Sequence, residues 1–120
     1  MWNAHRAATY ARQHALSSSQ GRCAEFVTRA VRDVDGASLH NTHFARDMGS
    51  NLILAGFHQV YGESIEGDIA VIQPTQNHPM GHACIYDGHR WISDFVQQHG
   101  MYPGQEYRTV RPSYAIYRHN

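Results

Sequence analysis

The chain has 120 residues, and its ten Lys and Arg residues balance ten Asp and Glu residues. This length suits one domain with its own hydrophobic core, so we predict a single domain over residues 1–120. The balanced charge, without a long basic run, gives no indication of nucleic-acid binding. The sequence has no stretch of about eighteen apolar residues and no apolar leader, so we expect neither membrane insertion nor a classical signal peptide.

Helices are predicted in the first half of the chain. Alanines at near-helical spacing indicate a helix over residues 3–16, which runs into a Ser-rich loop. In segment 22–34 the apolar residues recur at the spacing of one helix face, and Gly36 is the predicted stop. A third, shorter helix is predicted over residues 44–56.

Short runs rich in β-branched and aromatic residues make up most of the second half, with turn residues between them. Helices followed by strands predict an α+β fold, in which N-terminal helices pack on a largely antiparallel sheet. The predicted strands are residues 57–60, 68–72, 82–86, 90–95 and 113–118.

Cys23 is a candidate nucleophile because it lies at the start of the second predicted helix. Unpaired backbone N–H groups and the positive end of the helix dipole favour a thiolate there, which would lower a thiol pKa of about 8.5 toward neutrality. The alternative is that Cys23 is a small apolar residue on a buried helix face, since free cysteine is among the most buried residue types.

The hairpin GHACIYDGHRWISDF carries a histidine and an acid that a nucleophile would need. With a three-residue loop at 87–89, His82 pairs with Asp94 on the same face of the ribbon. An acid opposite a histidine holds the ring in one tautomer and stabilises its protonated form. With a two-residue Asp-Gly loop, His82 pairs with Ser93 instead, and Asp94 turns to the other face.

Other reactive residues carry weaker signals. Cys84 shares strand parity with His82, and we interpret it as core, although a bridge to Cys23 under oxidation stays open. Ten histidines suggest a zinc site as the rival chemistry. No metal-binding spacing is found, and Pro79 and Gly81 interrupt the interval between His78 and His82, so we predict no metal and no other cofactor.

Four segments follow an order and spacing that a known superfamily shares. SSSQGRCAEFV is similar to a Gly-x-Cys-apolar helix start, GDIAVIQ to a Gly-Asp-apolar strand, and GHACIYDG to a Gly-His strand and turn, while WISDFVQ supplies a polar third position. Together these segments resemble the NlpC/P60 and CHAP superfamily of papain-like cysteine amidases and endopeptidases. They span residues 17–97, which is most of the chain.

The resemblance implies a papain-like fold and an enzyme that hydrolyses amide bonds in peptidoglycan stem peptides or cross-links, through an acyl-enzyme on sulfur. It implies that Cys23 is the nucleophile, that His82 is the general base and then acid, and that Asp94 orients the histidine. The backbone N–H of Cys23 would stabilise the oxyanion, with Gln20 as a candidate side-chain donor.

Within the superfamily, the small size and lack of a signal peptide resemble amidase effectors of type VI secretion, which are delivered to the periplasm or cell wall of a target bacterium. That role implies a cognate immunity protein that plugs the cleft. A phage-type lysin would use the same chemistry. The alternatives are a cysteine protease or isopeptidase that acts on proteins, and a non-catalytic binding module on the same scaffold.

Overall fold

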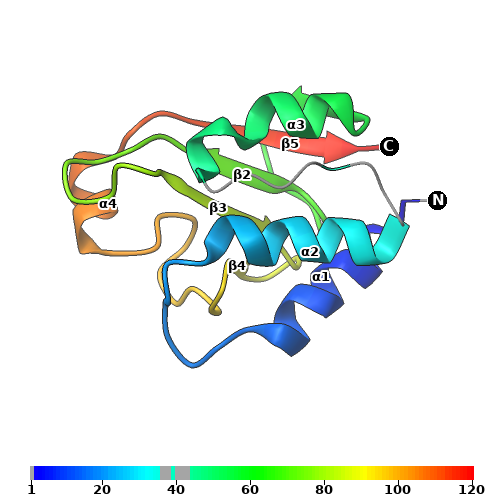
Figure 1. Cartoon of the computed structure of the whole chain (residues 1–120), viewed down its shortest axis with the longest axis horizontal. Coiled ribbons are helices and arrows are strands. Elements are labelled where there is room, and N and C mark those ends of the chain that lie inside the picture. The colour runs from blue at the N-terminus through cyan, green and yellow to red at the C-terminus, as the bar shows by residue number, and fades with distance from the viewer. Residues whose placement is uncertain (1, 36–38, 40–43) are drawn as a thin grey trace.

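The computed structural model describes residues 2–35, 39 and 44–120, and these form a sheet with helices on one face (Figure 1). The α+β class and the antiparallel sheet are confirmed, because every pair of neighbouring strands runs antiparallel in the order β1-β5-β2-β3-β4. The strands are β1 (Phe57–Val60), β2 (Ile69–Ile72), β3 (His82–Tyr86), β4 (Trp91–Ile92) and β5 (Tyr114–His119).

The predicted helices are present at the expected places. They are α1 (Ala4–His14), α2 (Cys23–Asp35) and α3 (Met48–Leu54), the last preceded by the 3-10 turn η1 (Ala45–Asp47). Asn3 caps α1, because its side chain accepts a hydrogen bond from the backbone N–H of Arg6 (3.0 Å). Gly36, the predicted end of the second helix, lies outside the described residues. No helix in the described part of the chain is long and apolar enough to span a bilayer.

One core joins the helices to the sheet. Alanines on α1, such as Ala7 and Ala11, allow α2 to approach closely, and Val27 and Val31 of α2 are buried with them. Leu52 brings α3 into the same core near β1 and β5. These apolar stripes explain why the helical periodicity of the sequence predicts the elements correctly.

The opposite face of the sheet has a smaller apolar cluster. Side chains alternate along β3, so that Ala83 and Ile85 belong to the core under the helices, whereas Cys84 packs with Trp91 in the second cluster. Both cysteines are free thiols, and Cys84 is fully buried, which confirms its interpretation as a core residue.

The β3–β4 hairpin has neither of the two predicted registers. Tyr86 pairs with Trp91, one position beyond the register of a three-residue loop. The carboxylate of Asp87 fixes this turn by accepting hydrogen bonds from the backbone N–H groups of His89 (2.8 Å) and Arg90 (2.6 Å). The prediction that His82 pairs with Asp94 across the hairpin was therefore wrong, because an Asx-type turn shifts the pairing.

The strand predicted over residues 90–95 ends early, because the chain reverses after β4. The N–H of Ser93 donates to the carbonyl of Phe95 (3.0 Å), and the N–H of Gln97 donates back to the carbonyl of Trp91 (2.9 Å). The reversal sends Gln97 back along the sheet. The short β4 also leaves the start of β3 without a strand partner on that side, and the N-terminal end of α2 packs against β3.

A short helix, α4 (Gln105–Val110), follows this reversal and was not predicted. It ends at Arg111, which adopts the left-handed conformation (φ 53°). Only Tyr107 of this helix is buried, so α4 has no full apolar stripe and no periodic signal in the sequence.

Candidate functional site

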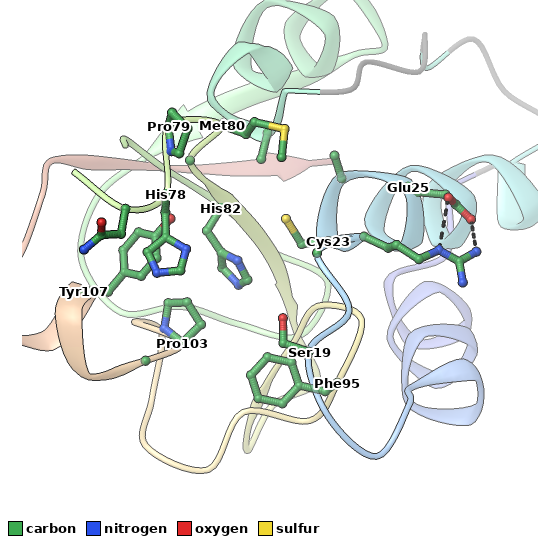
Figure 2. Close-up of a pocket in the computed structure, with 17 residues that line it drawn as sticks. Ser19, Cys23, Glu25, His78, Pro79, Met80, His82, Phe95, Pro103 and Tyr107 are labelled. Atoms are coloured by element: carbon green, nitrogen blue, oxygen red, sulfur yellow. Dashed lines mark hydrogen bonds and ion pairs between the residues drawn. The ribbon is translucent and has the colours of Figure 1, made fainter. Parts of the chain in front are cut away.

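A cleft of about 540 Å³ opens where the N-terminal end of α2 meets the loop before β3 and the start of α4 (Figure 2). Cys23 and His82 both point into it, and Tyr107 and Pro103 lie on the other side of His82. The lining residues are Ser19, Gly21, Arg22, Cys23, Ala24, Glu25, Ala45, Asn77, His78, Pro79, Met80, Gly81, His82, Phe95, Pro103, Gly104 and Tyr107.

Cys23 is the first residue of α2, as predicted, but its protonation state differs from the prediction. Burial raises the pKa of the thiol, and the nearby carboxylate of Asp94 raises it further. The backbone N–H groups of Ala83, Ala24 and Cys23 itself act in the opposite direction and do not compensate. The expected thiolate is therefore corrected to a protonated thiol, because desolvation exceeds the stabilisation at the helix start.

His82 is almost completely buried, with 6% of its surface exposed. Burial lowers the pKa of the imidazole from 6.5 to about 4. The hydrogen bond with Gln97 and the nearby carboxylate of Asp94 favour the charged form, while His78 opposes it. His82 is consequently a neutral imidazole at neutral pH.

Gln97 makes the contact that the sequence predicted for Asp94. Its Nε2 donates to the carbonyl oxygens of Gly100 and Met101, both at 2.8 Å, which fixes the orientation of the amide. Oε1 must then accept a hydrogen bond from Nε2–H of His82 (2.8 Å). The neutral ring therefore carries its proton on Nε2, and Nδ1 has the free lone pair.

Asp94 holds the segment that leads into α2 instead of orienting His82. Its carboxylate is fully buried and accepts hydrogen bonds from the backbone N–H groups of Gln20 (2.7 Å) and Arg22 (2.9 Å). Its own carbonyl accepts from the N–H of Leu16 (2.7 Å). Asp94 thus positions Cys23 through the backbone of the preceding loop.

Gln20, the candidate oxyanion donor, is exposed and is absent from the residues that line the cleft. Its side chain donates to the hydroxyl of Ser18 (3.2 Å). The contribution of Gln20 to the fold is its backbone N–H, which donates to Asp94.

The set of thiol, imidazole and amide can bind hydrogen-bonding groups without presenting a charge. A thiol beside a neutral imidazole can in principle transfer its proton to the ring. The raised pKa of Cys23 and the low pKa of His82 keep the proton on sulfur in the resting protein. Among the described residues, no group of three His, Cys, Asp or Glu side chains is arranged to hold a metal ion.

Acidification is expected to destabilise the fold through His82. Because its pKa is about 4 in the fold against 6.5 ordinarily, the unfolded chain binds the proton more tightly between these values. The free energy of unfolding should therefore decrease as the pH falls through this window, by about 3 kcal/mol at about 1.4 kcal/mol per pKa unit.

Urea unfolding of the wild type and of His82→Gln, between pH 7 and pH 4, measures this contribution. The His82→Gln variant should lose much less stability on acidification. His58→Gln is the matched control, because His58 is an exposed histidine on β1. Equal pH dependence in the wild type and in His82→Gln would contradict the assignment.

Two contributors to the site were not identified from the sequence. Gln97 was noted only within a polar third position, and no short-range pattern marks it, because it reaches His82 through the reversal after β4. Tyr107 lies on the unpredicted α4, and its ring is 5.9 Å from that of His82. Both depend on contacts between segments that are distant along the chain.

Comparison with solved structures finds two close matches. The first is a chain of the native type VI effector–immunity complex Tae3–Tai3 from Ralstonia pickettii, with 47% sequence identity, a TM-score of 0.96, and 99% of this chain and 100% of that chain covered. The second is a chain of the selenomethionine form of the Tae3–Tai3 complex from the same organism, with 49% identity, a TM-score of 0.90, and coverages of 93% and 98%. No family model and no curated protein matches the chain.

These findings correct the identification with the NlpC/P60 and CHAP superfamily and the papain-like fold implied by it, since the related structures are Tae3–Tai3 effector–immunity complexes. The prediction of a cysteine amidase or endopeptidase acting on peptidoglycan depended on that identification and on a thiolate at Cys23. The prediction of this enzyme is therefore corrected too, because both matching chains were crystallised in a complex of two proteins, which supports a binding role. The predicted link to type VI secretion and to a cognate partner agrees with both matches. The chain belongs to the family represented in the Tae3–Tai3 effector–immunity complexes.

Proposed function

We propose that this chain acts by binding a cognate protein partner of a type VI effector–immunity pair. The observation that carries the proposal is the match over 99% of the chain, at 47% identity, to a chain crystallised in such a complex. This corresponds to the binding alternative predicted from the sequence. The sequence predicted a single domain over residues 1–120 and a periplasmic location. Both predictions are part of this proposal.

We propose further that the partner binds at the cleft beside Cys23. A cleft of about 540 Å³ is large enough to take several side chains of a partner loop. Its rim has partly exposed apolar residues, including Met80, which is 43% exposed. A concave site with apolar lining residues and a few hydrogen-bonding groups is typical of binding clefts.

The charges around the cleft indicate an uncharged partner segment. Arg22 and Glu25 line the cleft but pair with each other, with Nη2 and Oε2 2.5 Å apart. His82 is neutral at neutral pH because of its low pKa. A charged partner group in the cleft would lose hydration without finding an unpaired opposite charge among these residues, which is costly.

The replacement Met80→Glu tests where the partner binds. A carboxylate at this rim position should weaken the complex about 100-fold, because a charged group would replace an apolar one and would have to be desolvated in the interface. Met80 is exposed enough for the variant to fold normally. The matched control is Ile53→Glu on α3, since Ile53 is 55% exposed and does not line the cleft.

Binding of the wild type and both variants to purified Tae3 and, separately, to purified Tai3 of Ralstonia pickettii can be measured by calorimetry. We expect the wild type to bind one of the two proteins, which also identifies the half of the pair to which the chain corresponds. Binding to neither protein would contradict the proposed function, and equal losses in Met80→Glu and Ile53→Glu would contradict the cleft as its surface. Release of muropeptides from purified sacculi by the wild type, but not by Cys23→Ala, would show that binding is not its whole function.

A further inference from the structure

We infer that Glu106 is a positioning residue that sets the opening of the cleft, by fastening the loop before β3 to α4. The inference rests on the proposed function, because the cleft is the surface on which we place the partner. Glu106 does not line the cleft, and it therefore acts through the residues that do.

The carboxylate of Glu106 gathers three donors from a single loop. The hydroxyl of Thr75 and the backbone N–H of Asn77 (3.1 Å) both donate to Oε2. The side-chain amide of Asn77 donates to Oε1 (2.5 Å). These hydrogen bonds lower the pKa of Glu106, with Thr75 the largest cause, so the carboxylate is ionised and accepts all three bonds at neutral pH.

The fastened loop forms one wall of the cleft. Thr75 and His78 exchange backbone hydrogen bonds, which closes residues 75–78 into a tight turn. Asn77 belongs to this turn, and the four residues that follow it up to Gly81 all line the cleft together with Asn77 itself. Figure 2 shows His78, Pro79 and Met80 along this wall. A shift of the turn would therefore move the wall.

The loop is held at both of its ends. At the end next to β3, the backbone N–H of Arg46 in η1 donates to the carbonyl of Met80 (2.9 Å), and the Arg46 guanidinium donates to the carbonyl of Pro79 (2.7 Å). At the end next to β2, Glu106 holds the turn. Loss of Glu106 would leave the turn held mainly from the η1 side.

Glu106 also brings the loop against the buried residue of α4. The next residue, Tyr107, is 2% exposed, and its ring lies 5.0 Å from that of His78 and 5.9 Å from that of His82. The contact between Glu106 and the loop thus holds His78 against Tyr107 on the same side of the cleft. The half-buried carboxylate of Glu106 in this way fixes the position of the wall to which both residues contribute.

The test compares Glu106→Ala and Glu106→Gln with Gln105→Ala. Gln105 is the matched control because it is exposed on the same helix and its side chain bonds only to Thr109 and Arg108 among the described residues. Glu106→Gln keeps the shape and one acceptor oxygen, so it should retain part of the wild-type behaviour. It also keeps the test interpretable if the alanine variant folds poorly.

The first measurement is the rate at which iodoacetamide alkylates Cys23 in the free protein, with the modified site identified by mass spectrometry because Cys84 is a second, buried thiol. Cys23 should be alkylated about tenfold faster in Glu106→Ala than in the wild type, because a less firmly held loop exposes the thiol. The increase in rate should be smaller in Glu106→Gln. Gln105→Ala should react at the wild-type rate. An unchanged rate in Glu106→Ala would overturn the inference, whether or not a partner binds.

The second measurement is affinity for Tae3 or Tai3, whichever binds the wild type. Glu106→Ala should bind about tenfold more weakly, because the partner must then order the wall itself. A faster alkylation rate with unchanged affinity would overturn the link between Glu106 and the partner. Failure of the wild type to bind either protein would contradict the proposed function and leave the alkylation result to decide the role of Glu106.

Discussion

Replacing Asp94 with alanine is expected to lower the free energy of unfolding by about 4 kcal/mol, since each hydrogen bond to a charged group contributes about 1.5–3 kcal/mol. The fully buried carboxylate accepts two backbone hydrogen bonds, from Gln20 and Arg22. Without it, two N–H groups in the loop before α2 lose their acceptor. Urea unfolding at neutral pH measures the change.

Asp94→Asn separates the charge of this residue from its shape. The amide keeps one acceptor oxygen but places N–H donors near the donors of the loop, so we expect an intermediate loss of stability. Asp47→Ala is the control, because Asp47 is exposed and its contact with Arg46 is long, at 3.9 Å. It should change the free energy of unfolding by less than about 0.5 kcal/mol. A loss below about 1 kcal/mol in Asp94→Ala would contradict the anchoring role.

Asp94→Ala should also affect the cleft. Because Asp94 positions Cys23 through the backbone of residues 20–22, the variant should alkylate faster at Cys23 than the wild type under conditions where both are folded. Asp94 is therefore a link between the stability of the fold and the shape of the site.

The second large effect is expected for Gln97→Leu. This replacement removes the hydrogen-bond partner of His82, and the contact between these two side chains is buried. It also removes the donor to the carbonyl groups of Gly100, which is exposed, and Met101, which is half-buried. An unsatisfied buried polar group costs about 1–3 kcal/mol, so we expect a loss of about 3 kcal/mol in the free energy of unfolding, mainly from His82. Gln98→Leu, at the neighbouring exposed position, is the control and should have little effect.

The Gln97 variants should also move the pKa of His82, which NMR titration of the imidazole can follow. The hydrogen bond from Gln97 raises this pKa against the effect of burial, so Gln97→Leu should lower it below about 4. Gln97→Glu should raise it, because a carboxylate favours the protonated ring. An imidazole pKa that stays the same in both variants would contradict the contact between the two side chains.

The helices and most strands could be predicted because their signals are local. The stripe of apolar residues on α2 and the β-branched runs of β2 and β3 each follow the period of their element. The short helix α4 lacks such a stripe, because only Tyr107 is buried, and it was missed. β4 was predicted too long, because a backbone reversal after Ile92 has no periodic signature.

The site was predicted only in part for a similar reason. Cys23 and His82 do line one cleft, as their places at a helix start and a strand start suggested. The partner of His82 was misplaced, because the side chain of Asp87 fixes a turn that shifts the hairpin register. Which polar residue then meets the histidine depends on the path of the chain after the turn.

The sequence by itself determined the α+β class, the order of the main elements and the placement of a thiol and an imidazole at the ends of neighbouring elements. Only the tertiary structure decided that Gln97 bonds His82, that Asp94 anchors the loop before Cys23, and that Glu106 fastens the cleft wall. It also decided the protonation states, since burial raises the pKa of Cys23 and lowers that of His82. The physical reason is that periodicity and helix starts are properties of neighbouring residues. Desolvation and hydrogen-bond partners instead come from segments far apart in the chain, such as Gln20 and Asp94, which are seventy-four positions apart.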